Sequence, residues 1–152
     1  MKWDRLFIAI GLCELAGFIG AIFTLPALID WYPRLQKPFF NPPNWVFAPV
    51  WILLYASMGI AVYWASEKGL TQKAKVLFGI QLGLNVLWTI LFFGLKNPAL
   101  GFVGILLLWI SIMATMLEFR KIEPKAAAIL IPYLLWTTFA GILNFYVMIL
   151  NP

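Results

Sequence analysis

Five apolar stretches of about 20 residues each constrain this chain more than any other feature of its sequence. They cover residues 6–28, 46–65, 76–95, 98–117 and 126–150, all approximate bounds. A helix of this length spans the ~30 Å hydrocarbon core of a bilayer, because each residue adds ~1.5 Å. Transmembrane strands are alternating segments of only ~10 residues. The sequence therefore predicts an all-α integral membrane protein, a single domain over residues 1–152 built as a five-transmembrane-helix bundle.

Composition agrees with a membrane protein and excludes several kinds of chemistry. Hydrophobic residues make up 63% of the chain and charged residues 11%, whereas soluble domains carry ~25% charged residues. The chain has no histidine and one cysteine, Cys13. Histidine-based acid–base catalysis, histidine metal sites and an intramolecular disulfide are therefore excluded. No glycine-rich phosphate-binding motif is present, so no motif indicates nucleotide binding. We expect no metal site and no cofactor.

The net charge of +5 is explained by membrane topology better than by nucleic-acid binding. Eight Lys and Arg residues fall at the N-terminus and in the second and fourth loops, and three fall in the first and third loops. Because cytoplasmic loops are enriched in these residues, we predict the N-terminus inside the cell and the C-terminus outside.

Several residues predict where helices begin and bend. Asn97 and Glu123 each precede a proline, as N-cap residues do at the start of a helix. Pro49 falls in the first turn of the second helix, where its missing N–H costs nothing. Pro132 lies inside the fifth stretch and is expected to kink it.

The first loop, residues 29–45, differs from the others in composition. It contains four prolines and five aromatic residues. Prolines restrict the free loop, and the aromatic side chains need a surface to cover, so we interpret the loop as an ordered lid over the helix bundle. The alternative is a belt of aromatic residues at the level of the lipid headgroups.

Motifs in three separate regions together resemble the translocator protein family, also called the tryptophan-rich sensory protein or peripheral-type benzodiazepine receptor family. The first region carries Trp31-Tyr32, Lys37-Pro38-Phe39, Pro42-Pro43-Asn44-Trp45, Ala48-Pro49-Val50-Trp51 and Leu54-Tyr55. The second carries Gln81-Leu82-Gly83-Leu84-Asn85, Trp88 and Phe92-Phe93-Gly94. The third carries Pro132-Tyr133-Leu134, Trp136, Phe139-Ala140 and Leu143-Asn144.

The resemblance implies a five-helix bundle with a ligand cavity under the first loop. It also implies a membrane receptor that binds porphyrins, such as protoporphyrin IX and haem, and isoquinoline or benzodiazepine drugs. Tetrapyrrole sensing or scavenging would be its role. One alternative is a light- and oxygen-dependent enzyme that degrades porphyrin, in which Trp51 and Trp136 react; no conventional catalytic motif is present. A second alternative is a tetrapyrrole transporter.

Ligand-binding residues carried over from the resemblance come from the first, second, third and fifth helices and from the first loop. They are Ala21, Thr24, Tyr32, Pro42, Phe47, Ala48, Trp51, Asn85, Trp88, Trp136, Ala140 and Leu143. On the fourth helix, which lacks a matching motif, Leu100, Val103 and Leu107 stand at the corresponding contact positions.

Other polar and small residues allow both a structural and a functional interpretation. Asn85 and Asn144 either bond neighbouring helices or orient a ligand. Glu14, the only acid in mid-span, is either structural or a functional contact. The pair Gly79 and Gly83 serves either internal packing or a homodimer face.

The end of the chain departs from animal members of the family. Their sterol motif has the form L/V-x-Y-x-K/R, and here Leu143 and Tyr146 are followed by no Lys or Arg. We therefore expect cholesterol not to be a natural ligand, and we expect a bacterial member located in the cell membrane.

Overall fold

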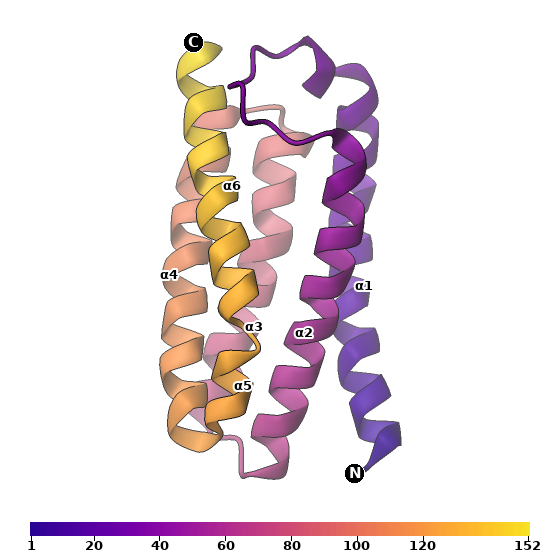
Figure 1. Ribbon diagram of the computed structural model, residues 1–152, viewed down its shortest axis with the longest axis vertical. Coiled ribbons are helices and arrows are strands. Elements are labelled where there is room, and N and C mark those ends of the chain that lie inside the picture. Colours follow the sequence, from indigo (N-terminus) through magenta and orange to yellow (C-terminus); the bar gives the residue numbers. More distant parts are fainter.

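The computed structural model describes all 152 residues as helices and loops, with no strand. The long helices are α1 (Trp3–Asp30), α2 (Phe47–Glu67), α3 (Gln72–Thr89), α4 (Pro98–Ile122) and α6 (Ile131–Leu150). Shorter elements are η1 (Tyr32–Arg34), η2 (Asn44–Val46), η3 (Ile90–Gly94) and α5 (Pro124–Ala128). Counting α5 and α6 as one span, five segments are long and apolar enough to cross a membrane. The predicted five-helix class is confirmed, and the two termini lie at opposite ends of the bundle (Figure 1).

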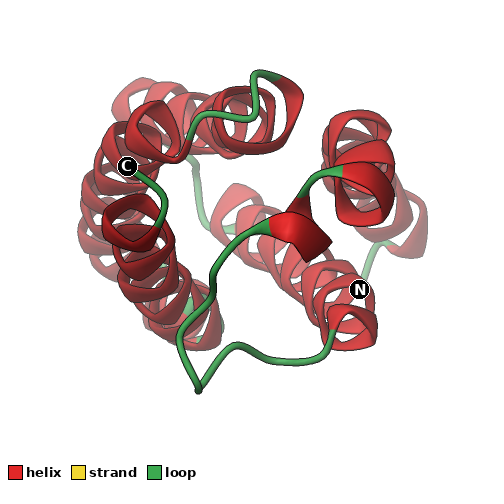
Figure 2. Ribbon diagram, turned by 90° about the horizontal axis from the view of Figure 1, so that it is seen from above, coloured by secondary structure: helices red, strands yellow, loops and turns green.

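The helices pack as two groups that meet along α3. One group pairs α1 with α2, and the other packs α4 against α3, α5 and α6. Helix α1 also contacts α3 and η3, whereas α2 touches α6 only briefly. The connection from α1 to α2 crosses the end of the bundle that carries the C-terminus (Figure 2).

The predicted helix signals act as expected. The Asn97 side chain accepts a hydrogen bond from the backbone N–H of Leu100, and Glu123 accepts one from Lys125. The fifth span is interrupted at residues 129–130, between α5 and α6, immediately before Pro132. Proline lacks an N–H for the preceding turn, and its ring clashes with the carbonyl four residues back, so the helix breaks there.

The third span ends in a way that the sequence analysis does not foresee. After Thr89 the chain widens into the π-helical turn η3, closed by a hydrogen bond of 2.7 Å from Leu95 N–H to the carbonyl of Ile90. Within this turn Phe92 and Phe93 are both buried. Such turns often occur at functional sites. This one lies at the end of the bundle that carries the C-terminus and the first loop, which is called the outer end below (Figure 1).

Glycines bring α1 and α2 into close contact at two levels, one near the middle of α1 and one closer to its N-terminus. A Cβ atom added at Gly59 would lie 2.5 Å from the Cα of Ile10, and one added at Gly17 would lie 2.6 Å from the Tyr55 ring. Cys13, on the same small-residue face of α1, is buried. Small residues in α1 therefore serve packing within one chain.

Replacing Gly59 by alanine tests this close approach. The new methyl group meets backbone, which cannot rotate away, so overpacking of about 1–3 kcal/mol exceeds the ~1 kcal/mol gained in helix propensity. We expect Gly59→Ala to lower the thermal unfolding midpoint in detergent. Gly141→Ala is the matched control, since its Cβ would lie at an ordinary 3.8 Å from Ile105. Equal midpoints for the two variants would contradict the close packing of α1 on α2.

Candidate ligand cavity

The bundle encloses a cavity of about 660 Å³ between α1, α2, α3, η3 and α6, beneath η1. This volume falls within the ~300–1,000 Å³ of small-molecule sites. Most of its lining is apolar. On α1 the lining extends from Gly11 to Leu28, a length of about 25 Å along the helix axis.

Aromatic side chains from two helices form the inner wall. The Trp51 ring of α2 lies 5.8 Å from the Trp88 ring of α3, and the Trp88 ring stacks on Phe92 at 6.1 Å. Tyr55 lies one turn below Trp51, with ring centroids 5.9 Å apart. Flat rings at these spacings present broad apolar faces, which suit a planar aromatic molecule.

A chain of hydrogen bonds between α2, α3 and α6 begins at the side chain of Tyr55 in the cavity wall. The Tyr55 hydroxyl donates to Asn85 Oδ1 at 2.8 Å, and Asn85 Nδ2 donates to the Tyr133 oxygen at 2.7 Å. The Tyr133 hydroxyl in turn donates to Gln81 Oε1 at 2.9 Å. All four side chains are buried. The chain satisfies polar groups that would otherwise be costly in hydrocarbon.

A second buried amide joins three helices near η3. Trp88 Nε1 donates to Asn144 Oδ1 at 3.2 Å, and Asn144 Nδ2 donates to the carbonyl of Pro98 at 2.8 Å. Of the two readings for Asn85 and Asn144, the geometry supports bonding between helices. Both residues also line the cavity, but their hydrogen bonds are made within the protein.

The first loop has an internal scaffold of its own. Tyr32 is buried, its ring lies 6.3 Å from Phe47 and 5.9 Å from Phe93, and its hydroxyl donates to Asn41 Oδ1 at 2.7 Å. Lys37 Nζ donates to the carbonyls of Tyr32 and Leu35, each at 2.8 Å. Burial lowers the pKa of Lys37 and raises the pKa of the Tyr32 phenol.

The loop is also tied to the C-terminal end of α6. Gln36 N–H donates to Asn151 Oδ1 at 3.0 Å, and Asn151 Nδ2 donates to the Gln36 carbonyl at 2.9 Å. These bonds, with the buried Tyr32, hold the loop across the outer end of the cavity. Whether it moves to admit a ligand remains a prediction.

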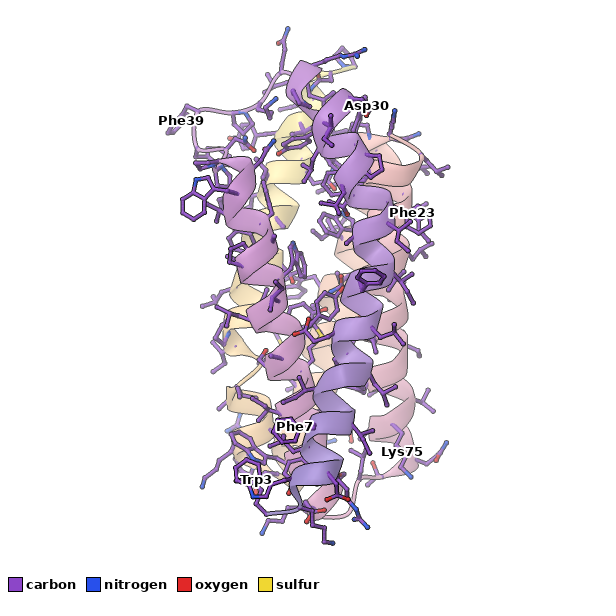
Figure 3. The ribbon with its side chains drawn as sticks, turned by 90° about the vertical axis from the view of Figure 1, so that its right-hand side faces the viewer. Trp3, Phe7, Phe23, Asp30, Phe39 and Lys75 are labelled. Carbon is purple, nitrogen blue, oxygen red and sulfur yellow. The ribbon has the colours of Figure 1, made fainter.

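The cavity also reaches the membrane-facing surface between α1 and α2. Leu15, Phe18 and Leu25 of α1 and Ile52 of α2 line it and are exposed on the outside of the bundle. The two helices are close in their lower halves and diverge toward the first loop (Figure 3). Between their upper halves, the cavity is open toward the position of the lipid chains.

Ten of the twelve predicted ligand-binding residues lie in the cavity wall. They are Ala21, Thr24, Tyr32, Phe47, Ala48, Trp51, Asn85, Trp88, Ala140 and Leu143. The structure brings them together from four helices and the first loop, and their contact with a ligand remains a prediction.

Two predicted residues lie elsewhere. Trp136 is in a separate shallow groove between α2 and α6, beside Leu135 and Phe139, and its ring lies 6.2 Å from that of Phe47, a cavity residue. Pro42 is part of the loop but not of the cavity lining, and its carbonyl accepts a hydrogen bond from Asn41. Trp136 lies in the same helix, α6, as the cavity residues Ala140 and Leu143, but its ring packs between α2 and α6 rather than in the cavity wall. Of the two tryptophans in the degradation scheme, Trp51 lines the cavity and Trp136 does not.

The fourth-helix residues also face away from the cavity. Leu100, Val103 and Leu107 are exposed on the outer face of α4, because α3 and α6 separate this helix from the cavity. Residues missed by the sequence analysis include Thr89, Phe92 and Phe93, which line the outer end. The motif Phe92-Phe93-Gly94 could have indicated the two phenylalanines. Their direction depends on the π-helical turn, which hydrophobic periodicity does not predict.

The fold and the cavity define a class: a five-helix membrane protein with an aromatic internal pocket. Sequence comparison gives the family, since the TspO/MBR family model matches residues 9–150. The chain belongs to the TspO/MBR family.

Similar proteins come from archaea, bacteria and animals. Tryptophan-rich protein TspO of Archaeoglobus fulgidus is 47% identical over 137 residues, covering 89% of each chain. Translocator protein of Bos taurus is 40% identical, covering 87% of this chain and 81% of its own. Tryptophan-rich sensory protein of Cereibacter sphaeroides is 34% identical, covering 99% and 94%. Together with the five spans, these relatives support a multi-pass integral membrane protein; the orientation of the termini stays a prediction.

The hydrogen-bonded chain beside the cavity gives a direct stability test. Tyr133→Phe leaves Asn85 Nδ2 and Gln81 Oε1 without their hydroxyl partner, at an expected cost of about 1–2 kcal/mol of unfolding free energy. Tyr146→Phe is the control, because Tyr146 is on the same helix and is exposed. Thermal unfolding in detergent should show a lower midpoint for Tyr133→Phe alone. A midpoint equal to that of the control would show that the buried chain adds no stability.

Proposed function

We propose that this protein binds porphyrins, including protoporphyrin IX and haem, and flat isoquinoline or benzodiazepine-type molecules in the cavity, as a sensor or scavenger of tetrapyrroles. The observation that carries the proposal is the wall formed by Trp51, Trp88 and Phe92, which presents aromatic faces to an apolar space of about 660 Å³. The name of one relative, tryptophan-rich sensory protein, agrees with a sensing role, whereas the name translocator protein agrees with the transporter alternative.

The shape of the cavity supports a flat and largely apolar ligand. Its walls offer rings and aliphatic side chains, and most of its polar side chains already hydrogen-bond within the protein. Affinity then comes from stacking and from removal of apolar area from water or lipid. The porphyrin carboxylates would remain near the outer end, where the loop backbone and the headgroup region lie.

A titration of protoporphyrin IX into the detergent-solubilised protein tests this function. We expect binding to saturate at one porphyrin per chain. The absorbance of the bound porphyrin measures it. Trp51→Leu should weaken binding about two- to tenfold, since an aromatic contact contributes about 0.5–1.5 kcal/mol. Trp3→Leu is the control: Trp3 is exposed at the far end of α1, outside the cavity.

Two outcomes would count against this function. Non-saturable binding would indicate mere partition of porphyrin into the micelle. Equal weakening by Trp51→Leu and Trp3→Leu would place the porphyrin somewhere other than the cavity.

We further propose that the first loop acts as the lid of the cavity. The buried Tyr32 and the hydrogen bonds of Lys37, Asn41 and Gln36 support this role, since a loop so braced loses little entropy when it covers a ligand.

Glycine substitution in the loop tests the lid. Pro42→Gly with Pro43→Gly increases the freedom of the open loop, so we expect protoporphyrin IX to dissociate faster while its association rate changes little. Stopped-flow dissociation measures this effect, and hydrogen exchange of the loop amides should rise in parallel. Pro124→Gly, at the first residue of α5 and at the opposite end of the bundle, is the control. Unchanged dissociation would assign the loop to the interfacial belt.

The exposed glycines of α3 support a homodimer. Cβ atoms added at Gly79 and Gly83 would meet nothing within 4 Å, and both glycines are exposed beside Val76 and Ile80. These glycines therefore serve no packing within the chain. Two copies could bring this face of α3 together closely, as small-xxx-small pairs allow in membranes.

A further inference from the structure

Glu14 is the only acidic side chain in the cavity wall, and no Lys or Arg lines the cavity. It lies near the inner end of the lining on α1, ten residues or about 15 Å from Thr24 along the helix axis. Its carboxyl makes no ion pair: the acids that do so are Asp30, Glu67 and Glu118.

Most other polar side chains of the wall already hydrogen-bond within the protein. Trp51 Nε1 has no such bond, but it can only donate, and it lies one turn from Tyr55 toward the first loop. Tyr32, Tyr55 and Trp88 donate to asparagine side chains, and Thr24 and Thr89 donate to backbone carbonyls of their own helices. The side-chain amides of Asn85 and Asn144 both hydrogen-bond to neighbouring helices. Asn44 has no such bond, but it is exposed at the outer mouth. Glu14 is therefore the polar side chain without a hydrogen-bond partner that lies nearest the inner end of the lining.

An unpaired carboxylate in the middle of a membrane is costly, at least ~2.5 kcal/mol on insertion scales. The neutral acid avoids this charge but keeps one O–H donor and acceptor oxygens without partners. The group best suited to such a site has a basic nitrogen, because an acid and an amine can pair with zero net charge.

We propose that Glu14 is a specificity-determining residue that selects flat aromatic ligands bearing a primary amine at their leading end. The inference rests on the cavity being the ligand site. The ligand enters as the neutral amine, and the carboxyl is neutral before binding. The Glu14 O–H bond breaks, its proton forms a new N–H bond on the amine, and the resulting ammonium and carboxylate share a charge-assisted hydrogen bond.

A matched pair of probes tests this selection. 9-(Aminomethyl)anthracene and 9-ethylanthracene share a flat three-ring body and differ by an amino group in place of a methyl group. We expect the full-length protein in detergent to bind both, measured by anthracene fluorescence with each probe's micelle partition measured separately. After that correction, the dissociation constant of 9-(aminomethyl)anthracene should be about tenfold or more below that of 9-ethylanthracene.

The ratio of these two dissociation constants, measured in variants, assigns the preference to one carboxyl. Glu14→Gln keeps the size of the side chain and should bring the ratio close to one by weakening only the amine. Glu14→Met should do the same, so the result does not depend on the folding of one variant. Asp4→Asn removes an acid from the first turn of α1, outside the cavity, and should keep the wild-type ratio.

The outcomes separate this inference from the proposed function. An unchanged ratio in Glu14→Gln, with saturable binding of 9-ethylanthracene and protoporphyrin IX, would overturn the role of Glu14 and leave the cavity function intact. Absence of saturable binding for 9-ethylanthracene and protoporphyrin IX in the wild-type protein would overturn both. Loss of the amine preference in Asp4→Asn as well would trace it to net charge and overturn the role of Glu14.

Discussion

Polar groups in hydrocarbon have no water to bond, and the structure depends on how this chain meets that constraint. Asn85 is the central case, since its amide accepts from Tyr55 and donates to Tyr133, linking α2, α3 and α6 at one point. Asn144 performs the same function nearer the outer end, between α3, α4 and α6. These bonds are directional, so they fix the rotation of each helix about its axis. The aromatic wall follows from that rotation: Trp51 lies one turn from Tyr55, and Trp88 lies three residues from Asn85.

The cavity exists because α1 and α2 approach closely at one end only. Gly59 and Gly17 allow the close approach, and above that level the helices diverge toward the first loop (Figure 3). Larger side chains, among them Phe18 and Leu25, then border an opening rather than a packed seam. One set of small residues thus determines both the strength of the helix pair and the position of the space above it.

Much of this arrangement could be predicted from sequence, for identifiable reasons. The five spans follow from the length of the apolar stretches, and the caps at Asn97 and Glu123 follow from local chemistry. Ten cavity residues came from motif resemblance across separate helices. Trp136 shares α6 with Ala140 and Leu143, yet its ring packs against Phe47 and Phe139, and this position depends on how closely α2 and α6 approach each other. The π-helical turn at η3 and the free carboxyl of Glu14 in the wall depend equally on neighbours far apart in the chain.

Because of the opening between α1 and α2, the free ligand from which binding is counted is dissolved in lipid rather than in water. A ligand that enters through this opening, which Phe18 and Ile52 border, comes from lipid rather than from water. Most of the free energy of its transfer out of water is therefore gained before it meets the protein. Discrimination then depends on what lipid cannot offer: ring stacking, a defined shape and a polar contact in the interior. Two ligands with equal affinity for the protein from within the bilayer would differ in apparent aqueous affinity by the ratio of their membrane partition coefficients. For the protein in membranes, an affinity measured from water therefore depends on the lipid composition of the bilayer as well as on the cavity.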